Sequence, residues 1–152
     1  MNRVFEAHTV SFFDIDANLV CLGMYLVSAL IGFVLPSLSW LSWVLPIVLL
    51  ILEKESKLVK FHAIQLLILQ VTVFVLGILL GIITVILGGV AVASGSAGAM
   101  LGIAGLVSIA ALILAYSFIA LELFCGYKAF NWTAFEVPFV GKFAANFAKI
   151  NE

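Results

Sequence analysis

The chain has 152 residues, of which 65% are hydrophobic and only 10% are charged, and its formal net charge is −1. A soluble domain is about 45–50% apolar and about 25% charged, so a water-soluble fold of this length could not bury so much apolar surface. The composition therefore predicts an integral membrane protein, and the near-neutral charge provides no attraction to nucleic acid. The length allows one helical bundle without a separate soluble domain.

The first apolar stretch, residues 17–35, follows a mixed N-terminal segment, residues 1–16, that contains several carboxylates. We expect residues 17–35 to form the first transmembrane helix, with Asp16 as its N-cap. A carboxylate at that position accepts hydrogen bonds from the free N–H groups of the first helical turn. Pro36 and Ser37 then break the helix and turn the chain.

The second apolar run, residues 38–52, is short for a crossing. As an α-helix its fifteen residues reach about 22 Å, whereas the hydrocarbon core is about 30 Å thick. Pro46 lies near the middle of the run and predicts a kink. A re-entrant segment is the alternative, but it would place Lys54, Lys57 and Lys60 on the outer side, against the charge rule. We therefore expect a thin, kinked span.

The third and fourth apolar runs are long enough to cross a bilayer. We expect Ser56 to cap the third helix, whose membrane segment covers residues 61–90 and must tilt because it is longer than a simple crossing needs. A neutral turn rich in Gly and Ser, residues 94–98, leads to the fourth span at residues 99–121. Glu122 marks the end of that span.

The charges of the chain are distributed asymmetrically. All seven Lys and Arg residues and all eight carboxylates lie on one side of the four-span arrangement. Short loops rich in Lys and Arg stay in the cytoplasm during insertion. Residues 17–122 are therefore predicted to form an all-α integral membrane bundle of four transmembrane helices with both termini in the cytoplasm. The lysines of the 53–60 loop are expected to contact an anionic inner leaflet.

Residues 123–152 form a cytoplasmic tail of different character. Their first part is a linker rich in aromatic side chains, and from Val140 onward the apolar residues fall at positions 140, 143, 147 and 150. This spacing predicts a short amphipathic helix. An interfacial helix that lies on the inner leaflet fits the pattern, and a helix docked on the cytoplasmic ends of the bundle is the alternative.

We recognise no catalytic set, cofactor motif or metal site in the sequence. His8 and His62 lie in different segments, no His-x-x-x-His or Cys-x-x-Cys spacing is present, and a metal site usually needs three or four ligands. A phosphate-binding loop is also missing. Charges in the middle of a span usually mark ion-coupled transport, and the four spans carry none. We expect no enzymatic activity, no cofactor and no metal.

The third span carries polar side chains on one face near its cytoplasmic end. His62, Gln65 and Thr72 fall at i, i+3 and i+10, and Glu122 should lie at a similar depth. In lipid such groups find partners across helix interfaces. We interpret the four residues as an interhelical polar cluster, with a His62–Glu122 contact as a specific hypothesis. A polar vestibule for a substrate or a partner segment is the alternative.

Small residues form one face on each of the two long helices. Such faces let helix backbones approach closely, and they predict tight packing of the third helix against the fourth. Assembly of several copies through one of the faces is the alternative. The faces consist of Gly77, Gly81, Thr84 and Gly88 on the third helix and Ala104, Ser108, Ala111 and Ala115 on the fourth.

Two short motifs resemble a known family. One is the run from Glu53 to Gln65, in which an acidic residue and Ser precede a basic-Phe-His-Ala-x-Gln pattern. The other combines Gly126-Tyr-Lys-Ala-Phe with a Pro-x-x-Gly-x-x-Ala tail. Together they resemble small bacterial membrane proteins of unknown function, a family that includes some magnetosome membrane proteins and is related to the small channel-type subunit of the chloroplast inner-envelope import translocon. Besides His62 and Gln65, the matching positions are Ser56, Phe61, Tyr127, Pro138 and Gly141.

The resemblance covers about residues 40–150. It implies a non-enzymatic multi-helix protein of a bacterial cytoplasmic membrane. With the small-residue faces, it favours an accessory or structural subunit that binds another membrane protein or a translocating polypeptide. A homo-oligomeric passive channel or carrier is the alternative, and its lining would have to come from His62, Gln65, Gln70 and Thr72.

Overall fold

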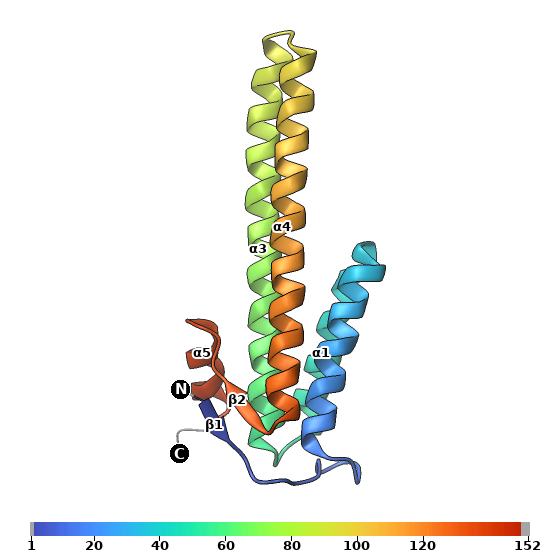
Figure 1. Ribbon diagram of the computed structural model, residues 1–152, viewed down its shortest axis with the longest axis vertical. Helices are drawn as coiled ribbons and strands as arrows, with labels where there is room; N and C mark the ends of the chain where they lie inside the picture. The colour runs from blue at the N-terminus through green and yellow to red at the C-terminus, as the bar shows by residue number, and fades with distance from the viewer. Residues whose placement is uncertain (1, 150–152) are drawn as a thin grey trace. The chain divides into compact units, whose positions relative to one another are not determined.

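The computed structural model describes residues 2–149, and most of them are helical (Figure 1). The elements follow in the order β1, α1, η1, α2, α3, α4, β2 and α5. The chain divides into two compact units. Unit 1 contains the chain up to Gln70 and from Ile119 onward, and unit 2 contains residues 71–118.

Three helices are long and apolar enough to cross a membrane: α1 (Ala17–Val34), α3 (Lys57–Ala93) and α4 (Ala97–Phe130). The predicted second span takes another form, because η1 (Pro36–Trp43) is a 3₁₀ helix and only α2 (Val44–Leu52) is α-helical. A 3₁₀ helix rises about 2.0 Å per residue, against 1.5 Å for an α-helix. The segment is therefore longer than the sequence alone suggested.

Helix α4 continues beyond its predicted end. It passes through Glu122 and ends at Phe130, so the first part of the predicted tail linker is helical. Gly126 lies where α4 meets α1, because a Cβ added there would be 3.0 Å from the Cβ of Tyr25. A glycine at this position therefore lets the two helices approach closely while α4 continues.

The structure adds a small antiparallel sheet to the predicted all-α bundle. Strand β1 (Asn2–Val4) pairs with β2 (Thr133–Phe135), and Arg3 lies opposite Ala134. Thr, Phe and Val favour strands, but strands of three residues are too short to show an alternating pattern. The pairing therefore depends on contacts between the two ends of the chain.

Unit 1 brings together the three segments that carry the charged residues. The N-terminal segment hydrogen-bonds to the connection between α2 and α3 and pairs with β2. Helix α1 packs against η1, and η1 leads into α2. The N-terminal segment, the α2–α3 connection and β2 consequently meet at one end of unit 1 (Figure 1).

The two predicted N-caps have different outcomes. The Val59 N–H donates to Ser56 Oγ at 3.2 Å, so Ser56 caps α3 as predicted. Asp16 occupies the N-cap position of α1, but its side chain makes no capping hydrogen bond. The Ala17 N–H instead donates to the His8 carbonyl at 3.0 Å. A backbone carbonyl of the N-terminal segment thus accepts a hydrogen bond from the first turn of α1, a role that was predicted for the Asp16 side chain.

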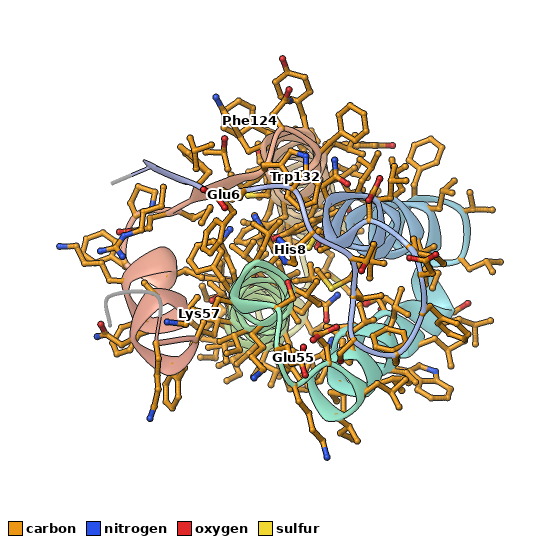
Figure 2. All side chains as sticks on the ribbon, turned by 90° about the horizontal axis from the view of Figure 1, so that it is seen from below. Glu6, His8, Glu55, Lys57, Phe124 and Trp132 are labelled. Carbon is orange, nitrogen blue, oxygen red and sulfur yellow. The ribbon has the colours of Figure 1, made fainter. Side chains whose placement is uncertain are left out.

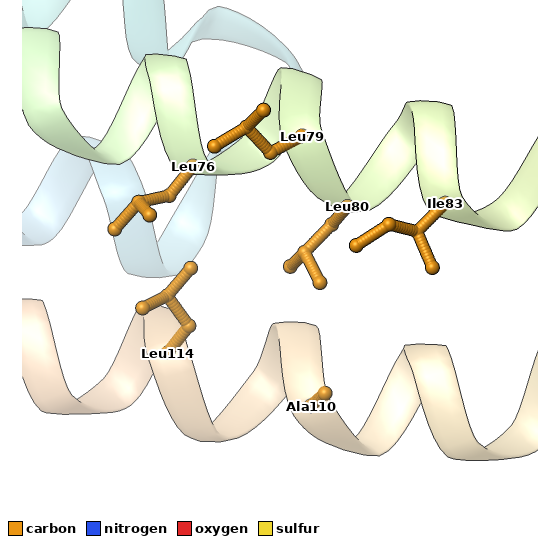
Figure 3. Close-up of a pocket in the computed structure, with 6 residues that line it drawn as sticks. All are labelled: Leu76, Leu79, Leu80, Ile83, Ala110 and Leu114. Carbon is orange, nitrogen blue, oxygen red and sulfur yellow. The ribbon is translucent and has the colours of Figure 1, made fainter.

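Unit 2 is a helical hairpin made of the second part of α3 and the first part of α4. The helices are joined by a turn in which Gly95 has a positive φ of 68°, a conformation that glycine adopts at little cost. Apolar side chains, most of them Leu or Ile, line a groove of about 340 Å³ between them (Figure 3). The lining residues are Leu76, Leu79, Leu80, Ile83, Ala110 and Leu114.

The predicted small-residue faces lie largely outside this groove. Gly77 and Gly81 are exposed, and a Cβ added at either of them, or at Gly88, would have no neighbour within 4 Å. Thr84 is half-buried, and its hydroxyl donates to the Leu80 carbonyl of its own helix. On α4 the whole face is exposed, namely Ala104, Ser108, Ala111 and Ala115.

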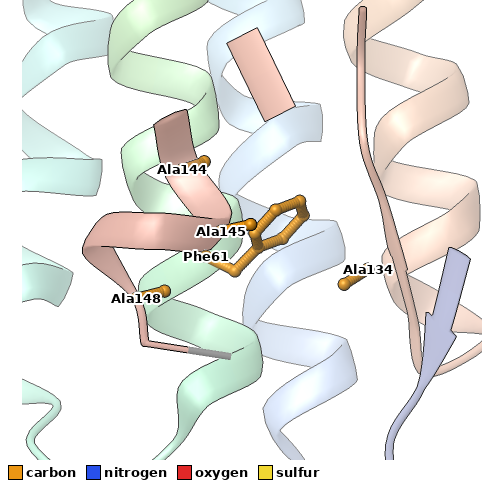
Figure 4. Packing of buried hydrophobic residues seen from close by; sticks show 5 residues of the cluster. All are labelled: Phe61, Ala134, Ala144, Ala145 and Ala148. Carbon is orange, nitrogen blue, oxygen red and sulfur yellow. The ribbon is translucent and has the colours of Figure 1, made fainter. Parts of the chain in front are cut away.

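The tail contains the predicted amphipathic helix, α5 (Val140–Phe147), but it buries a different face. Small residues of α5 pack against Phe61 of α3 (Figure 4), while Phe143 and Phe147 are exposed. Small side chains allow close approach to the Phe61 ring, which explains why they form the docked face. The predicted apolar set also included Ile150, which lies outside the described residues.

Candidate functional site

Gln65 of α3 is the centre of a buried polar cluster that also contains Tyr25, His62 and Cys125. Its amide nitrogen donates to the Tyr25 hydroxyl at 3.4 Å and lies 3.5 Å from Cys125 Sγ. Its amide oxygen accepts from the Val137 N–H at 3.3 Å. One fully buried side chain thereby joins α3 to α1, to α4 and to the tail.

Both ring nitrogens of His62 have partners in the same cluster. Nδ1 lies 3.2 Å from the Tyr25 hydroxyl, and Nε2 lies 3.2 Å from the Thr133 carbonyl oxygen. Because a carbonyl oxygen only accepts, Nε2 donates, and Nδ1 of a neutral ring accepts from Tyr25. His62 therefore pairs with Tyr25 and Thr133 in place of the hypothesised Glu122.

Glu122 belongs to a second buried polar group. Its carboxyl interacts with the Ser28 side chain, and Ser28 Oγ accepts a hydrogen bond from Gln70 Nε2 at 2.9 Å. The same nitrogen donates to the Ser42 carbonyl at 3.3 Å. These residues lie on α1, η1, α3 and α4. The predicted cluster is thus divided, because His62 and Gln65 lie in one group, Glu122 lies in another, and Thr72 lies in unit 2.

Glu53 binds the N-terminal segment to the start of α3. Its carboxylate accepts from the backbone N–H groups of Ser11 at 2.7 Å and of Glu55 and Ser56 at 2.8 Å each. Burial alone would raise the pKa of Glu53. The N–H groups outweigh that effect and hold the pKa below its ordinary value of 4.5, because hydrogen bonds to the charged form stabilise it.

His8 contacts the same connection (Figure 2). Its Nε2 lies 2.7 Å from Ser56 Oγ, its Nδ1 lies 2.8 Å from the Glu6 carbonyl oxygen, and its ring is 5.3 Å from that of Trp132. Since the carbonyl accepts from Nδ1, Nε2 of a neutral ring accepts from the Ser56 hydroxyl. Ser56 therefore caps α3 and holds the N-terminal segment at the same time.

The residues that carry the family resemblance have different environments. Ser56, Phe61 and Gly141 are buried, and Gly141 is required sterically, because a Cβ there would lie 2.4 Å from the Cα of Glu136. Tyr127 and Pro138 are exposed. Most of the matching positions thus serve to dock the tail and the N-terminal segment onto α3.

Tyr25 and Glu53 were not among the predicted site residues. The signal for Tyr25 was a hydroxyl within an apolar span, since a buried Tyr hydroxyl usually finds a hydrogen-bond partner. The signal for Glu53 was its position three residues before Ser56, close enough to reach the N–H groups that open a helix.

These groups connect the elements of unit 1 to one another through hydrogen bonds. Residues 2–149 contain no group of three or more His, Cys, Asp or Glu side chains that could hold a metal ion. Cys21 and Cys125 are free and buried. Among the described buried side-chain atoms, Asn18 Oδ1 and Gln70 Oε1 have no hydrogen-bond partner. In lipid, interhelical hydrogen bonds of this kind hold helices together.

Three long apolar helices and an interior held by hydrogen bonds between helices define a small multi-pass membrane protein. Residues 16–144 match the model of the magnetosome magnetite crystal formation protein family, and the chain belongs to this family. It is similar to a UPF0132 membrane protein of Methanocaldococcus jannaschii, with 38% identity over 99 residues, which cover 65% of this chain and 71% of that protein. No solved structure matches. The family membership confirms the resemblance to magnetosome membrane proteins.

Proposed function

We propose that the chain is a non-enzymatic accessory or structural subunit that binds another membrane protein through α3. The supporting observation is the glycine face of α3 within unit 2. A Cβ added at Gly77 or Gly81 would meet nothing within 4 Å. In a bilayer, such faces gain dispersion energy when a second helix approaches them closely. The groove between the two helices is lined instead by larger apolar side chains.

We propose four crossings of a bacterial cytoplasmic membrane, with both termini in the cytoplasm. With eight residues in η1 and nine in α2, the two elements have a combined helical length of about 30 Å at the standard rises, which is enough for the hydrocarbon core. The charged segments meet at one end of unit 1, as segments on one side of a membrane would. Their lysines favour the cytoplasmic side and an anionic inner leaflet.

A translocating polypeptide is a second candidate for the same face, and it rests only on the sequence resemblance to the import translocon. A homo-oligomeric passive channel or carrier has less support. Of its candidate lining residues, His62, Gln65 and Gln70 are buried in unit 1 and make hydrogen bonds within the protein. A water-filled path would have to replace those bonds. Assembly of several copies through the glycine face remains compatible with the first proposal.

Photo-crosslinking in the native membrane tests this proposal. A photoreactive residue at position 81 should give a single abundant adduct, and the same residue at position 82 provides the control. Adjacent helical positions point about 100° apart, so position 82 has nearly the same depth but a different face. A heterologous partner captured at 81 and not at 82 supports the accessory subunit. Adducts to the same chain alone would favour the homo-oligomer, and equal labelling at both positions would contradict the proposed face.

A further inference from the structure

Helix α5 has two faces of opposite kind. The docked face consists of small residues, of which Gly141, Ala144 and Ala145 are buried in α5 itself, and Ala148 continues it. The other face carries Phe143 and Phe147, which are 61% and 73% exposed. With about 100° per residue, the centres of the two faces are about 130° apart around the helix. The protein therefore binds α5 through its small side chains and leaves its large ones uncovered.

Phe139, at the start of α5, is a third exposed aromatic side chain. It is 84% exposed and has a positive φ of 66°, a conformation that costs a bulky residue energy and that persists where the surroundings enforce it. The close approach of Gly141 to Glu136 tightens the same turn. The fold thus holds an aromatic side chain in an exposed position despite local strain.

The docking partner of α5 lies where α3 becomes apolar. Phe61 follows Lys57 and Lys60, and no Asp, Glu, Lys or Arg occurs from residue 61 to residue 93. In a membrane protein this change in character marks the headgroup region. Because α5 packs on Phe61, it lies at the same level. Lys142 and Lys149, on the same segment, are exposed as well.

We propose that α5 is an in-plane lipid anchor whose face of Phe139, Phe143 and Phe147 inserts into the headgroup–acyl boundary of an anionic bilayer. Amphipathic helices that carry aromatic side chains on their apolar face and Lys on their polar side bury the apolar face by about 5–10 Å into this boundary. Lys side chains near an anionic surface strengthen this binding. The proposal is independent of the partner suggested for unit 2.

Site-directed spin labelling of the full chain tests the anchor. Single variants Phe143→Cys and Phe147→Cys are reconstituted in vesicles of phosphatidylcholine with phosphatidylglycerol, and the nitroxide's accessibility to oxygen and to a water-soluble nickel chelate is measured. Glu55→Cys is the aqueous reference and Val85→Cys, on an exposed position of α3, is the lipid reference. The unsubstituted chain controls for labelling of the two buried native cysteines.

Labels at 143 and 147 should resemble the label at 85, with high oxygen and low nickel accessibility. Nickel accessibility like that at 55 would show that the face is in water and would overturn the proposal. Low accessibility to both reagents with spin–spin broadening would place a second copy on the face, and low accessibility without broadening would place another protein segment there. Either result would also overturn it. If the labels at 143 and 147 lie equally deep in vesicles without phosphatidylglycerol, the lysines do not contribute to insertion, and the anionic part of the proposal is overturned.

Discussion

Single side chains in unit 1 accept hydrogen bonds from backbone N–H groups that would otherwise have no partner. Glu53 satisfies three N–H groups from two segments, and Gln65 connects four segments through one amide. Both are buried. In such positions the loss of one partner leaves others unpaired, which costs more than the bond itself contributed.

Glu53→Gln should lower the free energy of unfolding in detergent by about 1.5–3 kcal/mol at neutral pH, because its hydrogen bonds involve a charged acceptor. Folding lowers the pKa of Glu53 below 4.5. Its contribution is therefore complete above pH 4.5 and is lost as the pH falls through the lower pKa of the folded state. Unfolding curves at several pH values should show the difference between variant and native chain shrinking below pH 4.5.

Glu55→Gln is the matched control, because Glu55 is adjacent to this site and exposed. Its effect should stay within about 0.5 kcal/mol, as for most surface substitutions. A deficit of Glu53→Gln that is the same at every pH would show that the carboxylate charge is not what the fold uses.

Gln65→Leu should destabilise the folded chain by about 1–3 kcal/mol, because the Val137 N–H and the Tyr25 hydroxyl each lose a partner in a buried environment. Unfolding in mixed micelles measures the effect. Tyr127→Leu provides a comparison on an exposed side chain of α4 and should change little. Equal stability of Gln65→Leu and the native chain would mean that these hydrogen bonds are replaced elsewhere.

At the scale of elements, the docking of α5 depends on close approach rather than on large apolar side chains. Gly141 forms the tight turn that leads into α5, since a Cβ there would meet the backbone and Cβ of Glu136. The backbone there has little freedom to move, because the Gly141 N–H donates to the Val137 carbonyl at 2.7 Å. An added methyl group must therefore displace the helix.

Gly141→Ala should cost about 1–3 kcal/mol, the usual range for overpacking. The amides of Val140–Phe147 should exchange faster with deuterium, while those of α1 should not. Gly98→Ala, where nothing lies within 4 Å, is the control and should be neutral or slightly stabilising, because Ala favours a helix more than Gly does. Unchanged exchange in α5 of Gly141→Ala would argue against the tight turn between Glu136 and Gly141.

At the scale of the whole molecule, four crossings require that the turn between α3 and α4 lie on the side opposite the charged segments. In intact cells, an impermeant maleimide should label Ser96→Cys, whose side chain lies in an exposed turn. Glu55→Cys should react only after permeabilisation. Labelling of both positions in intact cells would contradict the proposed topology, and the native cysteines are buried.

The sequence by itself determined the membrane class, the three long helices, the Ser56 cap and the presence of an amphipathic tail helix. These features depend on composition and on patterns within a few turns of one element. The tertiary structure decided the β1–β2 pairing, the Glu53 contacts, the partners of His62 and the docked face of α5. His62 and Thr133, for example, are 71 residues apart. Such contacts follow from which segments pack together, and a local pattern contains no information about that.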